Sequence, residues 1–227
     1  MKEELKKYAE SLKVKLEENE VEKFGRVLNE EQRRLIYMKE LKEDRANQEK
    51  KKILENYEYF LRSIPPRYKD ATFNNFEGQK EKIEFLKQGK SAVLCGGNGT
   101  GKTHLGFASC RYFAEKGLKS KYVLAYEFFE DIKNSFKQSD TEDVLKEYAY
   151  YDYLVIDEID KAYGSQLEFI HLYHLINKRY NEIKPTILMT NTNKSELIEL
   201  IGASTLDRIA SEGAIIEMKG ENYRQKK

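Results

Sequence analysis

Short apolar runs alternate with helical patterns over roughly the last two thirds of the chain. Five runs are apolar enough to form buried strands: 92–95, 122–126, 153–156, 186–190 and 214–218. Between them, apolar residues recur at helical spacing near 102–116, 127–138, 141–149, 165–183 and 195–201. Strands that alternate with helices predict an α/β fold, in which helices cover both faces of a parallel sheet.

The first part of the chain has a different pattern. Residues 1–62 are crowded with Lys and Glu, contain no Pro and have Gly25 as their only glycine. Three narrow apolar stripes at helical spacing predict two or three amphipathic helices. The stripes are Leu5, Tyr8, Leu12 and Leu16; Leu28, Leu35, Met38 and Leu41; and Ile53, Tyr57, Phe60 and Leu61. Such helices suit either a solvated charged segment or a module that docks on a partner, and the pattern leaves both open.

Two consecutive prolines, Pro65 and Pro66, end this helical pattern, because proline cannot continue a helix. We therefore expect two regions, a charged helical region at 1–62 and an α/β domain at 63–227.

Composition narrows the classes of function. The chain has 227 residues with 40 basic and 39 acidic side chains, so no global charge attracts a polyanion, and a nucleic-acid contact requires a local patch. Residues 1–10 contain no apolar signal region and no later segment is long enough to cross a membrane, which predicts a cytoplasmic protein. Cys95 and Cys110 lack metal-binding spacing, so we expect two buried thiols in a reducing compartment.

The motif with the most specific chemistry follows the first predicted strand. It matches the P-loop pattern G-x-x-x-x-G-K-[ST] in full and opens a helix, as that pattern requires. Its backbone N–H groups and the helix N-terminus should bind phosphate oxygens. Lys102 should reach the β- and γ-phosphates, and the Thr103 hydroxyl should be a ligand of Mg²⁺. With His104 at the start of the helix, the predicted nucleotide-binding residues are Gly96, Gly97, Asn98, Gly99, Thr100, Gly101, Lys102, Thr103 and His104.

Two further strands end in polar residues that suit the same site. The run 153–156 delivers Asp157 and Glu158 to the rim of a parallel sheet, where such folds bind ligands. We expect Asp157 to hold Mg²⁺ through water and Glu158 to orient and polarise the attacking water. Asn191 follows the strand 186–190, and its position predicts a contact with the γ-phosphate or that water.

The alternatives to ATP fit less well. Asn193-Lys194-Ser195-Glu196 is a degenerate form of the guanine-reading N-K-x-D pattern, and the acidic strand has no D-x-x-G. Small-molecule kinases need an arginine-bearing lid that is not evident here. The motifs thus predict hydrolysis of ATP with Mg²⁺.

The ordered set of motifs resembles the DnaC/IstB-like branch of the AAA+ ATPases, and within it the DnaC-type helicase loaders of bacteria and phages. The resemblance covers residues 64–227 and rests on Ile64–Phe76, the P-loop, Val155–Ile159, Met189–Asn193, Leu206–Ile209 and Asn222–Arg224. It implies a five-stranded parallel sheet of order 5-1-4-3-2 without a lid domain. It also implies that Arg208 is an arginine finger that acts on a neighbouring subunit through self-association, and that Arg224 is a second sensor within its own subunit.

The resemblance further implies partners. The helical insertion at 127–138 would contact single-stranded DNA through Lys133, Phe136 and Lys137, although its aromatic spacing also suits an ordinary core face. We assign Phe128 and Ile132 to the core and leave Phe136 open. The basic residues Arg111 and Lys116 are most simply explained as a solvated face, and His171 and His174 as packing or surface residues.

The region 1–62 would dock on a hexameric replicative helicase, and it contains no Cys or His that would bind zinc. The sequence therefore favours an ATP-dependent helicase loader. A transposition helper ATPase that acts on duplex DNA and a non-hydrolysing ATP-binding adaptor of a helicase remain as alternatives.

Overall fold

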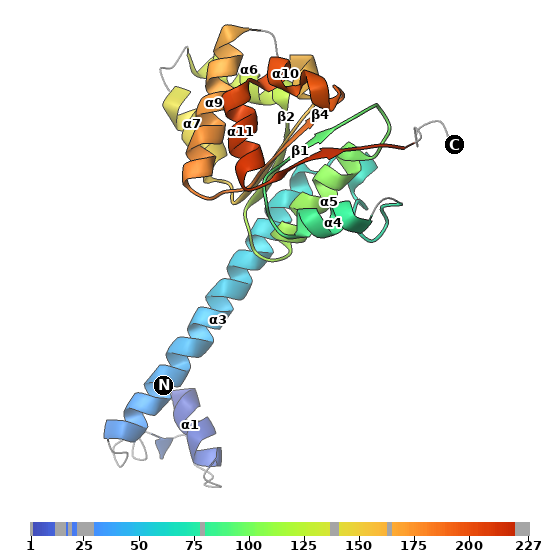
Figure 1. Ribbon diagram of the computed structural model, residues 1–227. Helices are drawn as coiled ribbons and strands as arrows, with labels where there is room; N and C mark the ends of the chain where they lie inside the picture. The colour runs from blue at the N-terminus through green and yellow to red at the C-terminus, as the bar shows by residue number, and fades with distance from the viewer. Residues whose placement is uncertain are drawn as a thin grey trace. The chain divides into compact units, whose positions relative to one another are not determined.

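Five parallel strands form the centre of the computed structural model of the protein (Figure 1). They are β1 (Ala92–Cys95), β2 (Ser120–Leu124), β3 (Tyr153–Asp157), β4 (Thr186–Thr190) and β5 (Ala214–Glu217). Their order is β2-β3-β4-β1-β5, and each neighbouring pair is parallel. This order confirms the expected 5-1-4-3-2 sheet. It places β1, β3 and β4, which carry the candidate site residues, side by side.

The structure describes residues 2–11, 17, 20–21, 30–77, 80–136, 141–162 and 165–220. Within these ranges the helices are α1 (Lys2–Ser11), α3 (Glu30–Ser63), α4 (Lys80–Lys87), α5 (Lys102–Ala114), α6 (Ala125–Ser135), α7 (Thr141–Tyr150), α8 (Ile159–Ala162), α9 (Gln166–Asn181), α10 (Leu197–Ile201) and α11 (Ala203–Ser211), with 3-10 turns η1 (Pro66–Tyr68) and η2 (Lys194–Glu196). No helix in the described part of the chain is long and apolar enough to span a membrane.

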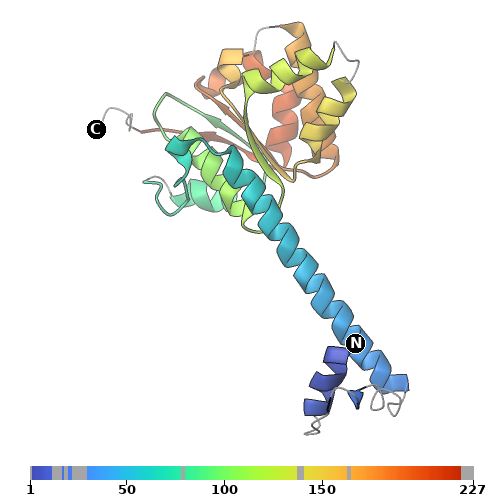
Figure 2. The same ribbon diagram turned by 180° about the vertical axis from the view of Figure 1, so that it is seen from behind.

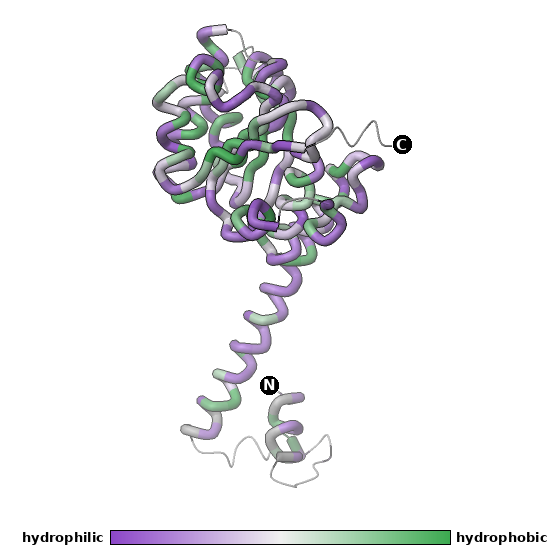
Figure 3. The backbone as a smooth tube through the Cα atoms, turned by 45° about the vertical axis from the view of Figure 1, so that its right-hand side comes forward, coloured by the Kyte–Doolittle hydropathy of each residue, from purple (hydrophilic) through white to green (hydrophobic). Residues whose placement is uncertain are grey.

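Side chains that alternate along the strands build one hydrophobic layer on each face of the sheet. Leu94, Val155 and Met189 pack with α4, α5 and the end of α3, whereas Ile156 and Leu188 pack with α6, α7, α9, α10 and α11. Figures 1 and 2 show these two helical layers from opposite sides. The strands are mainly hydrophobic and most of α3 is hydrophilic (Figure 3). A sheet buried on both faces explains why its strands read as continuous apolar runs.

The second strand lies earlier in the sequence than expected. The apolar run 122–126 predicts a strand, but β2 ends at Leu124 and α6 begins at Ala125. The cause is a cap, because the Leu124 N–H donates to the Glu127 carboxylate at 3.0 Å and so starts the helix. Helices α4 and α11 were not expected from the apolar spacing.

The chain divides into two compact units, Met1–Lys52 and Ile53–Lys227. This division falls ten residues before the expected boundary at 62/63, within α3. The reason is that the last turns of α3 pack into the larger unit: Phe60 is fully buried, and Asn56 Nδ2 donates to the Gly117 carbonyl at 2.8 Å. Leu35, Met38 and Leu41 of the second stripe and all of the third stripe also belong to this one helix.

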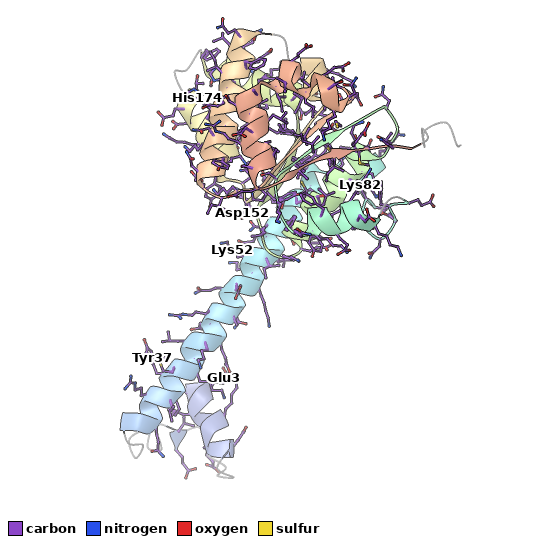
Figure 4. All side chains as sticks on the ribbon, in the orientation of Figure 1. Glu3, Tyr37, Lys52, Lys82, Asp152 and His174 are labelled. Atoms are coloured by element: carbon purple, nitrogen blue, oxygen red, sulfur yellow. The ribbon has the colours of Figure 1, made fainter. Side chains whose placement is uncertain are left out.

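The smaller unit buries few large side chains among its described residues. Leu5, Ala9, Val21 and Ile36 are buried. In contrast to the expected stripe, Leu35 and Met38 are exposed by 63% and 46%, and Tyr37 between them by 59% (Figure 4). Leu12, Leu16 and Leu28, and the side chain of Tyr8, lie outside the described residues. Among the described residues of this unit, the face of α3 that carries Leu35 and Met38 is therefore exposed.

Arg179 of α9 is fully buried and ties together the loops that enter the sheet. Its guanidinium donates to the carbonyls of Tyr148, Ala149, Tyr151 and Pro185 and to the Thr186 hydroxyl. Burial lowers the pKa of Arg179. Because Tyr151 and Pro185 lie just before β3 and β4, the side chain aligns the starts of these two strands.

Candidate functional site

The loop between β1 and α5 is built around glycines with positive φ. Gly96 has φ 131°, and a Cβ there would lie 2.4 Å from the Met218 carbonyl oxygen. Gly101 has φ 90°, and a Cβ there would lie 2.5 Å from the Phe76 ring. Only glycine fits these two positions, so the chain turns sharply into α5 at Lys102. The helix N-terminus follows the loop directly, as phosphate binding by a P-loop requires.

Lys102 is buried and points back across the loop. Its Nζ donates to the carbonyls of Gly96 and Gly97 at 2.5 and 2.8 Å. The loop is also anchored to the turn that follows β4, because the Gly96 N–H donates to the Thr192 carbonyl at 3.1 Å. The cation is therefore held at the centre of the loop.

Asp157 at the end of β3 is 3% exposed and receives several hydrogen bonds. Its Oδ2 accepts from the Thr103 hydroxyl at 2.9 Å and from the Tyr122 hydroxyl, and its Oδ1 accepts from the Glu158 N–H at 2.6 Å. Burial and the neighbouring Asp157 raise the pKa of Tyr122, which keeps its hydroxyl a donor. The predicted pair Thr103 and Asp157 is thus in direct contact.

Glu158 has backbone and side-chain geometry unlike those of Asp157. Its φ of 57° lies in the left-handed region, which is uncommon for a residue other than glycine. Its Oε1 is 2.6 Å from the Nζ of Lys161 on α8. The hydrogen bond to Glu158 raises the pKa of Lys161. The second acid therefore lies at the rim with an exposed cation as its partner.

Asn191 is held by an acid that the sequence did not single out. Asp160 accepts from the Asn191 N–H at 2.9 Å, from Asn191 Nδ2 at 3.0 Å and from the Thr190 hydroxyl at 3.0 Å. Burial alone would raise the pKa of Asp160, but these hydrogen bonds outweigh it and the pKa lies below its ordinary value. Because an ionised carboxylate only accepts, the amide nitrogen faces Asp160 and the amide oxygen faces elsewhere.

These side chains meet at one cavity of about 210 Å³. Its lining residues include most of the predicted set: Asn98, Gly99, Gly101, Lys102, Thr103, His104, Asp157, Glu158 and Asn191. Gly96, Gly97 and Thr100 belong to the same loop but do not line the cavity, and Thr100 instead bonds the Gly97 carbonyl at 2.9 Å. The His104 ring packs near Phe76, and its Nε2 lies 2.9 Å from the Thr72 carbonyl oxygen.

Arg67 and Tyr68 also line this cavity, and sequence reasoning missed them. They belong to η1, which begins at Pro66, so the prolines that end the helical pattern also place two side chains in the cavity wall. The available signal was the Pro-Pro pair followed directly by a cation and an aromatic residue.

Arg208 lies at the other edge of the sheet. It lines a separate cavity of about 420 Å³ with Ser91 and Pro185, the residues just before β1 and β4. Its guanidinium donates to Asn177 Oδ1, the Ser204 carbonyl and the Tyr173 hydroxyl at 2.7, 2.9 and 2.9 Å. The length of a four-residue strand, about 13 Å, separates the two edges. Arg208 is thus not part of the cavity that Lys102 lines, and Arg224 lies outside the described residues.

Helix α6 presents a core face and an exposed face. Phe128 and Ile132 are buried, as expected. Phe136 is 48% exposed, with its ring 5.6 Å from that of His171, and Lys133 is exposed. Lys137 lies outside the described residues. Lys133 and Phe136 are therefore accessible on the same helical end.

The assignment of Arg111 to a solvated face was wrong. Its side chain is buried and donates to the Ala71 and Lys69 carbonyls and to the Tyr57 hydroxyl. Arg111 therefore anchors the segment between α3 and α4. Lys116 is exposed, with its Nζ 3.9 Å from the Tyr112 ring centroid. His174 on α9 is exposed (Figure 4), whereas His171 is half-buried, and burial lowers its pKa.

Solved structures share this fold. The crystal structure of the DnaC helicase loader superposes with a TM-score of 0.60 at 20% identity and covers 68% of this chain and 100% of that chain. Replication initiator DnaA bound to AMPPCP and single-stranded DNA gives a TM-score of 0.60 at 23% identity and covers 70% of this chain and 52% of that one. These similarities show that the chain shares its fold with both proteins.

Curated proteins are also similar to this chain in sequence. The replicative helicase loader DnaC of Escherichia coli strain K12 is 29% identical over 160 residues, 64% of this chain and 65% of that protein. The ATP-binding protein of insertion sequence IS232 from Bacillus thuringiensis subsp. berliner is 29% identical over 149 residues, 63% of this chain and 59% of that protein. The chain therefore spans less than two thirds of the length of either relative. The family model described as IstB-like ATP binding protein matches residues 4–227, and the chain belongs to that family.

Proposed function

We propose that this protein is an ATP-hydrolysing helicase loader, which recruits a hexameric replicative helicase and helps to place it on single-stranded DNA. The observation that carries the proposal is the separation of Arg208 from the cavity that Lys102, Asp157 and Glu158 line. A hydrolysis site divided between the two edges of one domain is complete only when two copies meet. ATP turnover is then coupled to assembly, which is what a loading factor requires.

The residues of the cavity fit a nucleotide with Mg²⁺. The Thr103 hydroxyl and the Asp157 carboxylate are potential oxygen ligands beside the P-loop, with Thr103 Oγ1 2.9 Å from Asp157 Oδ2. Mg²⁺ is commonly bound by one or two such groups together with phosphate oxygens. When bound, the ion neutralises charge that develops on the transferred phosphoryl group. The Thr103–Asp157 pair would hold it at the start of α5, beside the phosphates.

The remaining side chains divide the work of hydrolysis. When the nucleotide binds, Lys102 exchanges the carbonyls of Gly96 and Gly97 for the β- and γ-phosphates. The exchange is favourable because an ammonium group bonds a charged phosphate oxygen more strongly than a neutral carbonyl. Glu158 exchanges Lys161 for the attacking water, which it orients and from which it accepts a proton. With its nitrogen held by Asp160, Asn191 offers its amide oxygen to the same water.

Arg208 acts on a neighbouring subunit. Its fixed bonds to Asn177, Ser204 and Tyr173 hold the guanidinium ready at the sheet edge, and it must exchange some of them for a γ-phosphate. Hydrolysis by an isolated subunit is therefore slow. Arg224 completes the arrangement as a sensor within its own subunit, a role that rests on the sequence.

Two surfaces suit the proposed partners. Lys133 and Phe136 combine a cation with an exposed ring, as single-stranded DNA binding requires. Leu35 and Met38, three residues apart, form an exposed apolar face of α3 in the smaller unit. Such a face suits the docking of another protein, and we assign the helicase to it.

A transposition helper is the second candidate. It is favoured by the IS232 relative, whose identity to this chain, 29%, equals that of E. coli DnaC. A helper of this kind would use the same ATP site but act on duplex DNA together with a transposase.

The test is a loading reaction with the purified full chain, ATP, circular single-stranded DNA and the replicative helicase of the same cell or phage. A loader transfers the helicase onto the circles only with ATP, and Leu35→Asp abolishes the transfer. Leu54→Asp is the matched control, since Leu54 is also exposed on α3, by 55%, and should have no effect. Retention on duplex DNA with the transposase, without helicase transfer, would replace the loader by the helper.

A further inference from the structure

Tyr122 of β2 contacts the carboxylate at the centre of the proposed Mg²⁺ site. Its hydroxyl donates to Asp157 Oδ2 at 2.5 Å. The same oxygen accepts from Thr103, and Oδ1 accepts from the Glu158 N–H. β2 and β3 pair in register with Leu124 opposite Asp157, so Tyr122 reaches the carboxylate from two residues earlier on the edge strand.

A column of aromatic rings fixes the position of that hydroxyl. The Tyr122 ring stacks on Phe107 of α5 with centroids 3.9 Å apart and planes at 19°. Phe107 in turn stacks on Tyr68, with centroids 4.8 Å apart and planes at 18°. Tyr68 lines the nucleotide cavity. The column therefore runs from the cavity wall to Asp157, and Tyr122 has little freedom to turn away.

Gly106 shows that the helix is adapted to this column. A glycine inside a helix is destabilising relative to alanine. Yet a Cβ at Gly106 would lie 2.6 Å from the Met189 methyl, 3.1 Å from the Tyr122 ring and 3.2 Å from Val155. The glycine lets α5 approach the sheet closely at the point where the Tyr122 ring lies.

We infer that Tyr122 is a positioning residue for metal-dependent nucleotide binding, an inference that rests on the proposed function. Of the donors to Asp157, the Thr103 hydroxyl would itself become a ligand of Mg²⁺. The hydroxyl of Tyr122 is then the side-chain donor that remains on Oδ2. It fixes the carboxylate in one orientation, so that binding the ion costs no loss of carboxylate freedom.

The test measures the Mg²⁺ dependence of nucleotide binding rather than turnover. Binding of N-methylanthraniloyl-ATP to the full chain is followed by fluorescence, in EDTA and at increasing Mg²⁺. In Tyr122→Phe, which keeps the stacked ring, the half-saturating Mg²⁺ concentration should rise about tenfold, the effect of losing one hydrogen bond to a charged group. Affinity in EDTA should stay unchanged, because the phosphate-binding loop is untouched.

Tyr153→Phe is the matched control. Tyr153 is fully buried at the start of β3, four residues before Asp157, and its ring packs at a tilt of 30° against Phe113 rather than against the column. An equal Mg²⁺ shift in both variants, or no shift in Tyr122→Phe while the unaltered chain binds the nucleotide, would refute the positioning role and leave the nucleotide site intact. Failure of the unaltered chain to bind the nucleotide with or without Mg²⁺ would overturn both the inference and the proposed function.

Discussion

Two acids that are adjacent in the sequence have opposite environments. Asp157 is almost completely buried and saturated with donors, whereas Glu158 has a left-handed backbone and a side chain 35% exposed. The partner of Glu158, Lys161, is 56% exposed, and an exposed ion pair of this kind contributes only about 0–1 kcal/mol. Asp157 is therefore suited to hold a fixed ion. Glu158 is suited to change partners during a reaction.

This difference predicts separate effects on binding and turnover. Glu158→Gln should bind ATP as the unaltered chain does but lower kcat by about a hundredfold or more, because it removes the general base. Lys102→Ala should lose nucleotide binding itself. Steady-state turnover and fluorescent-nucleotide binding measure the two effects, with Glu115→Gln, an exposed acid at the end of α5, as control. Normal turnover in Glu158→Gln would instead favour a non-hydrolysing adaptor.

Arg179 predicts a stability effect without a role in the site. Arg179→Met would leave buried carbonyls without donors, so we expect the free energy of unfolding to fall by about 3 kcal/mol. Arg179→Lys should rescue little of it, because an ammonium group cannot reproduce the planar fork of donors. Urea unfolding measures the change, with Lys178→Met as the neighbouring control. A loss below 1 kcal/mol would show that water satisfies these carbonyls.

At the scale of elements, a local sequence motif predicted the strand and the helix that flank it. The motif from Gly96 to Thr103 requires a strand before it and a helix after it, and the structure has both. Asn191 was predicted to approach the same site because its strand lies between β1 and β3, and it lines the cavity with Lys102. The sheet order came from family resemblance, since apolar runs alone do not specify which strands are neighbours.

The features that the sequence did not predict depend on contacts between residues that no local pattern reveals. The start of α6 is set by the Glu127 cap, and Tyr122 and Asp160 bond residues on other strands or loops. Likewise, the packing boundary at 52/53 depends on which face of a continuous helix meets the core. No local signal marks it, whereas the two prolines mark only where the helix stops.

Helix α6 predicts an electrostatic and a stacking contribution to DNA binding. Lys133→Ala should weaken binding of single-stranded DNA and reduce the slope of log affinity against log salt by about 0.7. Phe136→Ala should cost about 1–3 kcal/mol if one base stacks on the ring in place of His171. Fluorescence anisotropy with an oligonucleotide at several salt concentrations measures both, with Lys146→Ala on α7 as control. Unchanged affinity in both variants would remove α6 from the DNA contact.

At the scale of the whole molecule, the nucleotide cavity and Arg208 occupy opposite edges of one sheet. Under the proposed function, Arg208 cannot reach the site of its own subunit but can reach that of a second copy, so each edge of the domain would supply half of a catalytic unit. Among the described residues, the hydrogen-bond partners of Arg208 are Asn177, Ser204 and Tyr173. None of them belongs to the P-loop, as the position of Arg208 at the opposite edge explains.

Mixing two inactive variants tests this arrangement directly. A Lys102→Ala subunit cannot bind ATP but still presents Arg208, and an Arg208→Ala subunit binds ATP but lacks the cation, which in trans contributes about 10³-fold or more to kcat. In the presence of single-stranded DNA and helicase, the mixture should hydrolyse ATP well above the sum of the two variants measured alone. The control replaces the first variant by the double variant Lys102→Ala, Arg208→Ala, which supplies no guanidinium and should restore nothing. If the double variant also restored turnover, assembly alone would activate the site. If the Arg208→Ala variant had full turnover by itself, the guanidinium at this edge would take no part in hydrolysis.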